Sequence, residues 1–435
     1  MYEDIILLIS VSYLLLLGFL ITPSISDEMI YVNMAKVLAE GHFPYKHFFY
    51  AHPPLQLFLL APLTLPKSFL FIKFFVACLA QLSLILVFLI SKEIFRNEKI
   101  AFLSFLFFLL FPGYIIYSSQ VLGIFESLFF FLLGFYLLLK KRLFISSLFF
   151  VISLFTRYLI VFLFPLILIY LLKYKKGQLK IFLKYLISLT FVFFTTFCLF
   201  FGKDFFTDTV LYHIYTNLTI NLKQKIDWYL SFNFFTIFLL LLSLNYGIKN
   251  KNFKLILFPV YCLMYDMVTL LLIKNMFYHY FILPLPFVFI STAYVFEKEK
   301  NLVTKIFIIS IILLALFTNY TNISEFFNKR NEIVLSELVS YIINNTNENE
   351  TIAGFHIPSN YVSFITDRKI AGNYFDSTPR FMEYFGKEKF LFQIKKLKPK
   401  IIFEPLSYSR YFSDQYEIVE KFRLGKINLV MMKIK

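Results

Sequence analysis

Two adjacent carboxylates, Asp27 and Glu28, follow directly after the first apolar run of the sequence. A carboxylate at such a boundary is able to act as a general base, or to supply hard oxygen ligands to a divalent ion such as Mg or Mn. The alternative is structural: acidic residues at the start of a helix complement its dipole, which contributes roughly 0.3–1 kcal/mol. The pair alone does not choose between these two interpretations.

Arg157 is the second residue type that suggests chemistry, because it lies between two apolar runs. A guanidinium at membrane depth is rare and suits bidentate contact with phosphate. The alternative is an arginine at a helix end whose head reaches the interface. Lys46, Lys274 and His279 are weaker candidates for the same phosphate-binding role. The histidines His42, His47 and His52 recur every five residues, which is not the spacing of a helical metal site.

Composition defines the setting of these groups. Of 435 residues, 59% are hydrophobic and only 16% are charged, whereas a soluble domain is nearer one quarter charged. The chain is therefore expected to be a polytopic membrane protein, which excludes a cytosolic enzyme, a disordered scaffold and a secreted disulfide-rich domain. The three cysteines lie in apolar runs, so no disulfide framework is expected.

The apolar runs predict a mainly α-helical bundle of about eleven membrane spans, since each span needs about 20 apolar residues. The predicted spans are 5–22, 69–91, 100–117, 121–139, 143–155, 158–172, 185–201, 229–246, 255–273, 278–296 and 303–318. The runs at 143–155 and 158–172 are short. They are compatible with two spans, a re-entrant pair or one bent helix.

Basic residues favour a cytoplasmic N-terminus. With that orientation the inner loops are 92–99, 140–142, 173–184, 247–254 and 297–305, and they carry 17 Lys or Arg. The longer outer segments before residue 319 carry eight, which is a positive-inside bias. The bias requires that 143–172 cross an even number of times, and it accounts for much of the net charge of +16 without invoking nucleic acid.

The outer segments predict further elements. Residues 28–40 have helical spacing, with Ser26 or Asp27 as N-cap and Gly41 at the end, and Pro53-Pro54 opens a short helix through Leu60. This first outer loop, 23–68, is expected to be amphipathic and to lie along the membrane. Residues 319–435 have soluble composition and predict a small extracytoplasmic α/β domain. Its expected helix is 330–345, and its expected strands are Thr351–His356, Tyr361–Thr366, Lys400–Phe403 and Ile427–Lys433. We therefore expect two domains, 1–318 and 319–435.

Several short motifs together resemble one family. They are Asp27-Glu28, Tyr31, Ala35, Glu40-Gly41, Pro44-Tyr45, Phe48-Phe49-Tyr50, His52-Pro53-Pro54-Leu55, Thr156-Arg157, and Tyr278-His279-Tyr280 followed by Leu283-Pro284. This set of motifs resembles the GT-C glycosyltransferases, in the branch that contains the protein O-mannosyltransferases, the aminoarabinose transferases and the RgtA-like sugar transferases. The likeness departs at His47, where many members carry Asp.

The resemblance implies a reaction: a sugar passes from a polyprenyl phosphate to an envelope glycan, lipid or protein at the outer face, usually with inversion. It also implies roles for residues. Asp27 would be the base, Glu28 would orient or bind the acceptor, and Glu126 would bind acceptor or metal. Arg157, Lys46, Lys274 and His279 would bind the lipid phosphate, while Tyr45, His52, Pro53 and Tyr278 belong to the loop motifs. No cofactor is certain, although a divalent cation is compatible with the carboxylates.

Two other classes compete with this interpretation. A transporter or flippase of lipid-linked sugars would also be polytopic, but transporters often show internal repeats and charged helices at the midplane. Here no repeat is evident, and acidic residues cluster at the predicted outer face. A non-catalytic subunit that binds a lipid-linked sugar is the third class. The sequence does not identify the sugar, the acceptor or the oligomeric state.

Overall fold

The computed structural model describes residues 2–23, 26–215, 220–274, 276–425 and 427–435, without the side chain of Phe232. The chain forms two compact units, and neither is continuous in sequence. Unit 1 comprises Met1–Leu20, Phe74–Thr195 and Thr219–Phe326, and unit 2 comprises Ile21–Lys73, Thr196–Leu218 and Phe327–Lys435. The first outer loop therefore groups with the C-terminal tail. The functional division at residue 318 stays a prediction.

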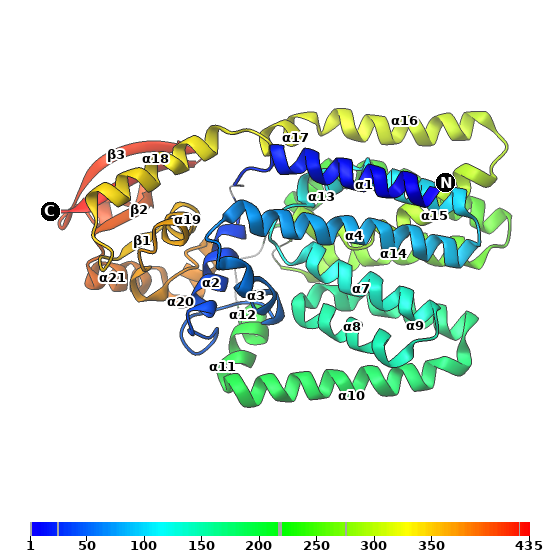
Figure 1. Ribbon diagram of the computed structural model, residues 1–435, viewed down its shortest axis with the longest axis horizontal. Coiled ribbons are helices and arrows are strands. Elements are labelled where there is room, and N and C mark those ends of the chain that lie inside the picture. Colours follow the sequence, from blue (N-terminus) through cyan, green and yellow to red (C-terminus); the bar gives the residue numbers. More distant parts are fainter. Residues whose placement is uncertain (1, 24–25, 216–219, 275, 426) are drawn as a thin grey trace. The chain divides into compact units, whose positions relative to one another are not determined.

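Unit 1 is built from helices (Figure 1). They are α1 (Tyr2–Leu20), α4 (Phe69–Phe95), α5 (Glu98–Leu109), α6 (Pro112–Tyr117), α7 (Ile124–Leu139), α8 (Leu143–Thr156), η2 (Tyr158–Leu163), α9 (Phe164–Tyr174), α10 (Lys176–Phe201), α13 (Leu222–Lys249), α14 (Phe253–Leu272), η4 (Tyr278–Ile282), α15 (Leu285–Lys298), α16 (Leu302–Thr318) and α17 (Tyr320–Phe326). Helices α4 and α10 continue into unit 2.

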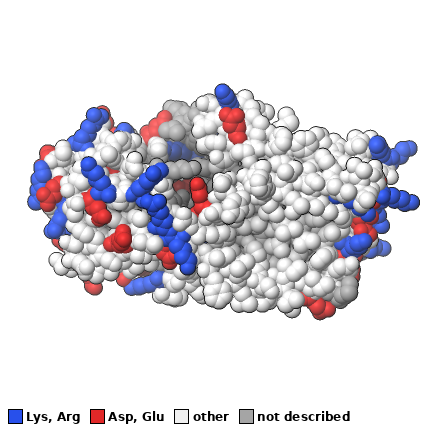
Figure 2. Space-filling view, turned by 90° about the horizontal axis from the view of Figure 1, so that it is seen from above, with Lys and Arg blue, Asp and Glu red and all other residues white. Residues whose placement is uncertain are grey.

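Within the described residues, four helices are long and apolar enough to cross a membrane, or up to six if each bent pair is one span. Shorter apolar helices include α7, α8 and the η2–α9 segment. The chain is thus a multi-pass membrane protein, while the predicted count of eleven spans stays a prediction. On the face shown in Figure 2, the helices of unit 1 are mostly covered by uncharged side chains, and lysine and arginine gather toward one end of them.

Ion pairs and hydrogen bonds join the loops that carry these basic residues. They are the ion pairs Lys92–Glu3 (2.9 Å), Lys140–Glu93 (2.6 Å) and Lys99–Glu297 (2.9 Å), and the hydrogen bonds from Lys175 to the Leu139 carbonyl and from Lys254 to the Ile94 carbonyl, both 2.8 Å. The five loops predicted to be inner therefore lie at one end of unit 1, which we call the basic end. Which side of the membrane it faces stays a prediction.

The segment 143–174 leaves the basic end and returns to it. Helix α8 begins at Leu143, next to the basic loop 140–142, and ends just before Arg157. Helix α9 ends beside Lys175, whose ammonium donates to the carbonyl of Leu139 at the basic end. A contact between its two arms supports this hairpin, since the rings of Phe150 in α8 and Phe164 in α9 have centroids 5.5 Å apart. The segment is therefore not a single bent crossing, and Arg157 lies at its tip.

Unit 2 combines short helices with a sheet. Its helices are α2 (Glu28–Ala39), α3 (Leu55–Leu60), η1 (Ala61–Thr64), α11 (Lys203–Phe206), a π turn η3 (Thr207–Leu211), α12 (Tyr212–Tyr215), α18 (Arg330–Asn345), α19 (His356–Thr366), η5 (Ala371–Asn373), α20 (Pro379–Phe385), α21 (Lys387–Leu397) and η6 (Leu406–Tyr411). The four strands are β1 (Ile352–Gly354), β2 (Ile401–Pro405), β3 (Tyr416–Leu424) and β4 (Ile427–Ile434), in the order β1-β2-β4-β3.

The sheet is mixed and has apolar residues packed on both faces. Strands β1 and β2 are parallel, and the other pairs are antiparallel. Ile402, Val430 and Met432 pack in one buried cluster with residues of α20 and α21. Ile401 and Met431 pack in a second cluster with residues of α18 and α19. The alternation of neighbouring residues between the two clusters is the two-residue period of a strand.

The tail confirms three of its four expected strand positions and corrects the fourth. Residues Tyr361–Thr366 were expected to be a strand, but they form the second half of α19. Their apolar and β-branched run is compatible with a buried helix as well as with a strand, and α19 is buried along almost its whole length. Strand β3 was not expected, because its residues Glu417–Lys421 are mostly exposed and charged.

Helix α2 has the predicted bounds within one residue and packs against α19. Asn33 donates to Asn360 at 3.0 Å, and the ammonium of Lys36 binds the carbonyls of Ser363 (3.2 Å) and Phe364 (3.4 Å) at the end of α19. Lower residue numbers of α2 thus meet lower numbers of α19, so the two helices run parallel.

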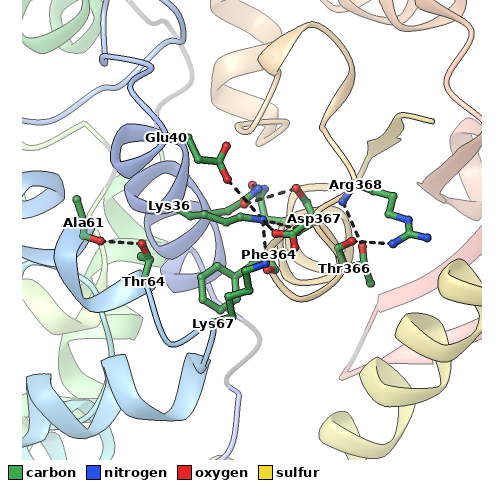
Figure 3. Close-up of polar contacts among 12 residues, drawn as sticks. Lys36, Glu40, Ala61, Thr64, Lys67, Phe364, Thr366, Asp367 and Arg368 are labelled. Atoms are coloured by element: carbon green, nitrogen blue, oxygen red, sulfur yellow. Dashed lines mark hydrogen bonds and ion pairs between the residues drawn. The ribbon is translucent and has the colours of Figure 1, made fainter. Parts of the chain in front are cut away.

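Asp367 closes the C-terminal end of this interface (Figure 3). It sits in a left-handed conformation after α19 and binds Lys36 at 2.5 Å as well as Lys67. Cations near the last carbonyls of a helix stabilise it through hydrogen bonds and the helix dipole. Helix α2 is buried on most of its circumference within unit 2, so it is a packed core helix there.

Candidate functional site

Asp27 lies where two helices begin. It precedes α2 as its N-cap residue, and one of its carboxylate oxygens, Oδ1, is 3.8 Å from Nε2 of His356, the first residue of α19. Because α2 and α19 run parallel, both N-termini lie at this end of the interface, and both helix dipoles favour a negative charge there. The side chain of Asp27 is 37% exposed, so a substrate has access to it.

A strand and a glycine place His356. The chain leaves β1 at Gly354, which has a φ of 114°. A Cβ at that position would lie 1.9 Å from the carbonyl oxygen of Phe403, so only glycine fits. Helix α19 begins two residues later at the carboxyl end of the strand, with His356 in its first turn.

The surroundings of His356 keep its imidazole neutral. Burial lowers the pKa of His356 to about 4, although the nearby carboxylate of Asp376 acts in the opposite direction. Its Nδ1 has no hydrogen-bond partner among the residues that the structure describes. Burial also raises the pKa of Asp376, and the negative charge of Asp27 adds to this effect. A neutral imidazole adds no positive charge beside the carboxyl groups of Asp27 and Asp376.

A second group of contacts in unit 2 holds the loop motif. Arg380 contacts Nδ1 of His213 at 2.9 Å, and Nε2 of the same ring lies 2.7 Å from the carbonyl of Ala51. Nε2 is therefore assigned as the donor to Ala51, which leaves Nδ1 to accept from Arg380. The rings of His213 and His52 are stacked with centroids 5.9 Å apart.

His52 and its neighbours fix the conformation of the loop. The hydroxyl of Tyr31 is 3.0 Å from Nε2 of His52, and the hydroxyl of Tyr45 donates to the His52 carbonyl at 2.5 Å. Pro53 follows, and Pro54 is the N-cap residue of α3. The motif residues Tyr31, Tyr45 and His52 are thus connected by hydrogen bonds that fix the conformation of this loop.

Glu28 has different surroundings from its neighbour Asp27. It is fully buried, and both its carboxylate oxygens accept from the ammonium of Lys73, at 2.8 and 3.0 Å. Lys73 is also fully buried. A buried ion pair costs desolvation, which only good geometry and further hydrogen bonds offset. The predicted role of Glu28 in orienting or binding the acceptor stays a prediction.

In unit 1 the candidate residues lie at the end opposite the basic end. Arg157 is 3% exposed and lies between α8 and η2 in an extended backbone conformation. Its charge acts on His279, which is in the first turn of η4. The fact that α15 reaches the basic end at Glu297 places η4, at its start, at the other end. Arg157 and His279 are therefore neighbours, and their role in binding phosphate stays a prediction.

Glu126 lies at the same end of unit 1. It is in the first turn of α7 and is fully buried. Gly123 precedes it with a φ of 76°, a conformation that suits glycine and turns the chain into the helix. Ser153 of α8 donates to the carbonyl of Ser127 at 2.7 Å, which connects the start of α7 to the turn that holds Arg157.

The remaining candidates have more peripheral positions. Tyr278 packs its ring on Trp228 with centroids 5.4 Å apart, and the carbonyl of Lys274 accepts from the backbone of Ile220. Lys46 belongs to unit 2, where its exposed ammonium lies 4.5 Å from the centroid of the Phe200 ring. The structure therefore groups Arg157 with His279 in unit 1, and Asp27 with His356 in unit 2.

Within the described ranges, no group of three His, Cys, Asp or Glu side chains is arranged to hold a metal ion. The buried Glu126 and the ion-paired Glu28 do not form such a group with Asp27. A divalent cation therefore stays a prediction that rests on the type of the residues alone.

Solved structures were compared with the chain as a whole. The chain shares the fold of ArnT. ArnT from Cupriavidus metallidurans in the apo state has a TM-score of 0.68 and 8% sequence identity, with 98% of this chain and 97% of that chain covered. The same protein bound to undecaprenyl phosphate has a TM-score of 0.67 and 9% identity over the same shares. No family model and no curated protein sequence matches the chain. At this identity the likeness establishes the fold.

Sequence reasoning missed several residues of these groups. Lys73 lies inside an apolar run, where a lysine needs a partner and is a signal of its own. His356 and Asp376 are far from Asp27 in sequence, and nothing local in the chain connects them. Arg380 was likewise one of many basic residues in a soluble tail. The parallel packing of α2 and α19 and ring contacts such as Phe49–Phe381 bring the first loop and the tail together.

Proposed function

We propose that the protein is a membrane glycosyltransferase that moves a sugar from a polyprenyl phosphate to a hydroxyl of an envelope glycan, lipid or protein. One observation carries the proposal. Asp27, a partly exposed carboxylate, lies at the neighbouring N-termini of α2 and α19, beside the buried neutral imidazole of His356. The fold of ArnT, which binds undecaprenyl phosphate, supports a polyprenyl-linked donor. The motifs of the first outer loop support the same class of reaction.

In this proposal Asp27 is the general base. It accepts the proton of the acceptor hydroxyl as that oxygen attacks the anomeric carbon of the donor. The new bond forms between the acceptor oxygen and the anomeric carbon while the bond from that carbon to the phosphate oxygen breaks. Its electron pair stays on the phosphate, and the attack from the opposite face inverts the anomeric centre. The neutral His356 supports this role because it does not neutralise the base.

Arg157 is proposed to bind the phosphate of the lipid. Its planar guanidinium can bind two phosphate oxygens at once. Its burial strengthens the attraction between the guanidinium and the negative charge that develops on the phosphate. His279, Lys274 and Lys46 are proposed as further contacts, and Glu126 as an acceptor or metal ligand. If a divalent cation binds, it would neutralise part of the phosphate charge. The apolar helices of unit 1 offer the surface for the prenyl chain.

The proposed orientation follows from the charge bias. The basic end of unit 1 is proposed to be cytoplasmic, with the N-terminus, because 17 basic residues occupy its predicted loops. The end that holds Glu126, Arg157 and His279 is then extracytoplasmic. The C-terminal α/β region is proposed to be on that outer side too, where lipid-linked sugars meet envelope acceptors.

A transfer assay tests the proposal. The purified protein in lipid nanodiscs is given a polyprenyl phosphate sugar with a radiolabelled sugar and an envelope fraction. Transfer of label to an acceptor, with an inverted linkage by NMR, is the expected result. Movement of the labelled lipid across vesicle membranes without transfer would instead identify a flippase. Donor binding with neither activity would identify a non-catalytic subunit.

The same assay examines Arg157. Replacing it by Lys keeps the charge but removes the planar fork, so the KM for the donor is expected to rise about tenfold. Arg142→Lys is the matched control, because Arg142 is exposed in the loop between α7 and α8 at the basic end. Equal donor KM values for the two variants would contradict the phosphate role of Arg157.

A further inference from the structure

Unit 2 contains a pocket of about 300 Å³ that none of the roles above uses. Its lining comes from three separate parts of the chain: the first outer loop, the π turn η3, and the segment from η5 to α20. The volume is at the small end of the range for ligand pockets, roughly 300–1,000 Å³. The pocket is therefore suited to one or two rings of a small ligand.

Aromatic rings form most of its wall. Phe49 packs against Phe381 with centroids 4.9 Å apart and against Tyr384 at 6.1 Å. Phe48 and Phe385 also line the pocket. Tyr384 is 37% exposed, so part of its ring is available to a ligand. Flat aromatic rings bury large apolar areas at little cost in side-chain entropy.

Two carboxyl groups supply the polar part of the wall. Asp208 belongs to η3, and Asp376 follows η5, where its Oδ1 accepts from the backbone of Thr378 at 2.8 Å. Burial and the neighbouring Asp204 raise the pKa of Asp208 to about 7, while a backbone hydrogen bond from Tyr50 lowers it. Among the described lining residues there is no lysine or arginine. A phosphate or carboxylate ligand would therefore find no cation in this lining to pair with.

From this combination of aromatic faces and two carboxyl groups we infer that the pocket binds one sugar ring of the glycan on the acceptor. The apolar C–H face of a sugar packs on an aromatic ring, and its hydroxyls form hydrogen bonds with carboxyl groups. A lipid chain would remove water from both carboxyl groups and offer them no hydrogen bond in return. The inference rests on the proposed function, because it assigns the acceptor of that transfer to the class of glycans.

Binding of soluble sugars tests the inference without any turnover. The full-length protein in lipid nanodiscs is mixed with methyl α-mannoside, methyl β-glucoside or methyl β-galactoside, and saturation-transfer NMR measures each Kd. At least one glycoside is expected to bind, and Tyr384→Ala and Asp208→Asn are each expected to raise its Kd about tenfold. Lysine methyl ester is the cationic probe, and it is expected to bind more weakly than the best glycoside.

Matched controls separate the pocket from general effects on unit 2. Tyr411→Ala removes an aromatic side chain of similar exposure, 40%, outside the pocket. Asp414→Asn removes an exposed carboxylate of the same unit that pairs with Lys395. Both controls are expected to keep the wild-type Kd. Equal losses in controls and pocket variants would overturn the inference, as would glycoside binding that no pocket substitution changes, or tighter binding of lysine methyl ester.

The transfer assay distinguishes failure of the inference from failure of the proposed function. If both hold, Tyr384→Ala raises the KM for the acceptor and leaves kcat within about twofold. Glycoside binding that Tyr384→Ala and Asp208→Asn weaken, in a protein that transfers no sugar, supports the pocket and contradicts the proposed function. Transfer with an acceptor KM that neither substitution changes contradicts the pocket and supports the function.

Discussion

The two ends of the α2–α19 interface differ sharply, although the same two helices form both. At the C-terminal end, Lys36 binds two carbonyls of α19 and the carboxylate of Asp367, which Lys67 also binds (Figure 3). At the N-terminal end, Asp27 and His356 approach only to 3.8 Å, and Asp27 is partly exposed. One end therefore is a clamp of short polar contacts, and the other holds a carboxylate that is partly exposed to solvent.

The adjacent residues Asp27 and Glu28 repeat this contrast on a smaller scale. Glu28 is buried in a bidentate pair with Lys73, whereas Asp27 is accessible. Neighbours in sequence thus have opposite environments, because successive residues of a helix point in directions about 100° apart. A charged pair in a sequence therefore does not share one role by default, and each carboxylate has to be tested alone.

The largest expected effect comes from breaking the buried pair. Lys73→Met leaves the carboxylate of Glu28 buried without its cation, which is expected to lower the free energy of unfolding by about 3–5 kcal/mol. Denaturant unfolding of the purified protein measures this loss. The double variant with Glu28→Gln is expected to recover most of it, because no charge is then left buried. A single variant as stable as wild type would show that the pair is not structural.

A second effect sharpens the contrast at His356. Its pKa is about 4 in the folded protein and near 6.5 when unfolded. The unfolded chain therefore binds more protons between these values, so the contribution of His356 to stability rises with pH by about 3 kcal/mol across that window. The difference in unfolding free energy between wild type and His356→Gln at pH 4.5, 5.5 and 6.5 measures it. A difference that falls with pH would mean that His356 is a protonated partner of Asp27.

How far the sequence predicts this arrangement depends on the range of each interaction. Helix α18 has the predicted bounds 330–345, and α2 follows Asp27 as expected, because caps and periodicity are local signals. The hairpin at 143–172 followed from loop charges. Tyr361–Thr366 was wrong, because an apolar run of that length does not distinguish a buried helix from a strand.

The partners of the candidate residues lay beyond local reasoning. Asp27 and His356 are 329 positions apart in the sequence, and their contact depends on the packing of α2 on α19. Glu28 meets Lys73 across a loop and two short helices. The sequence selected Asp27 as a candidate, whose role stays a prediction, and the structure added His356 as its neighbour.

The clamp at the C-terminal end predicts a smaller loss. Lys36→Met removes the bonds to Ser363, Phe364 and Asp367, and the expected loss of stability is about 1–3 kcal/mol. Thermal unfolding measures it, and sugar transfer by the folded variant is expected to stay within about twofold of wild type. A large loss of transfer without a loss of stability would remove the distinction between the two ends.

The smallest effect is expected from Glu40→Gln at the end of α2. Glu40 is about half exposed and its carboxylate is 3.9 Å from the ammonium of Lys36. An exposed pair at this separation contributes little, within about 0.5 kcal/mol, because water and salt screen it. Unfolding and transfer are both expected to match wild type. The variant therefore serves as the carboxylate control on the same helix as Asp27.

The rate of sugar transfer by Asp27→Asn tests the central claim most directly. The side chain of Asp27 makes no capping hydrogen bond to α2, and Asn has the same shape, so the melting temperature is expected to stay that of wild type. The loss of the base is expected to lower kcat by roughly 10²–10⁴-fold, while Glu40→Gln retains the wild-type rate. A folded Asp27→Asn protein that transfers sugar at a near-normal rate would contradict the assignment of Asp27 as the base.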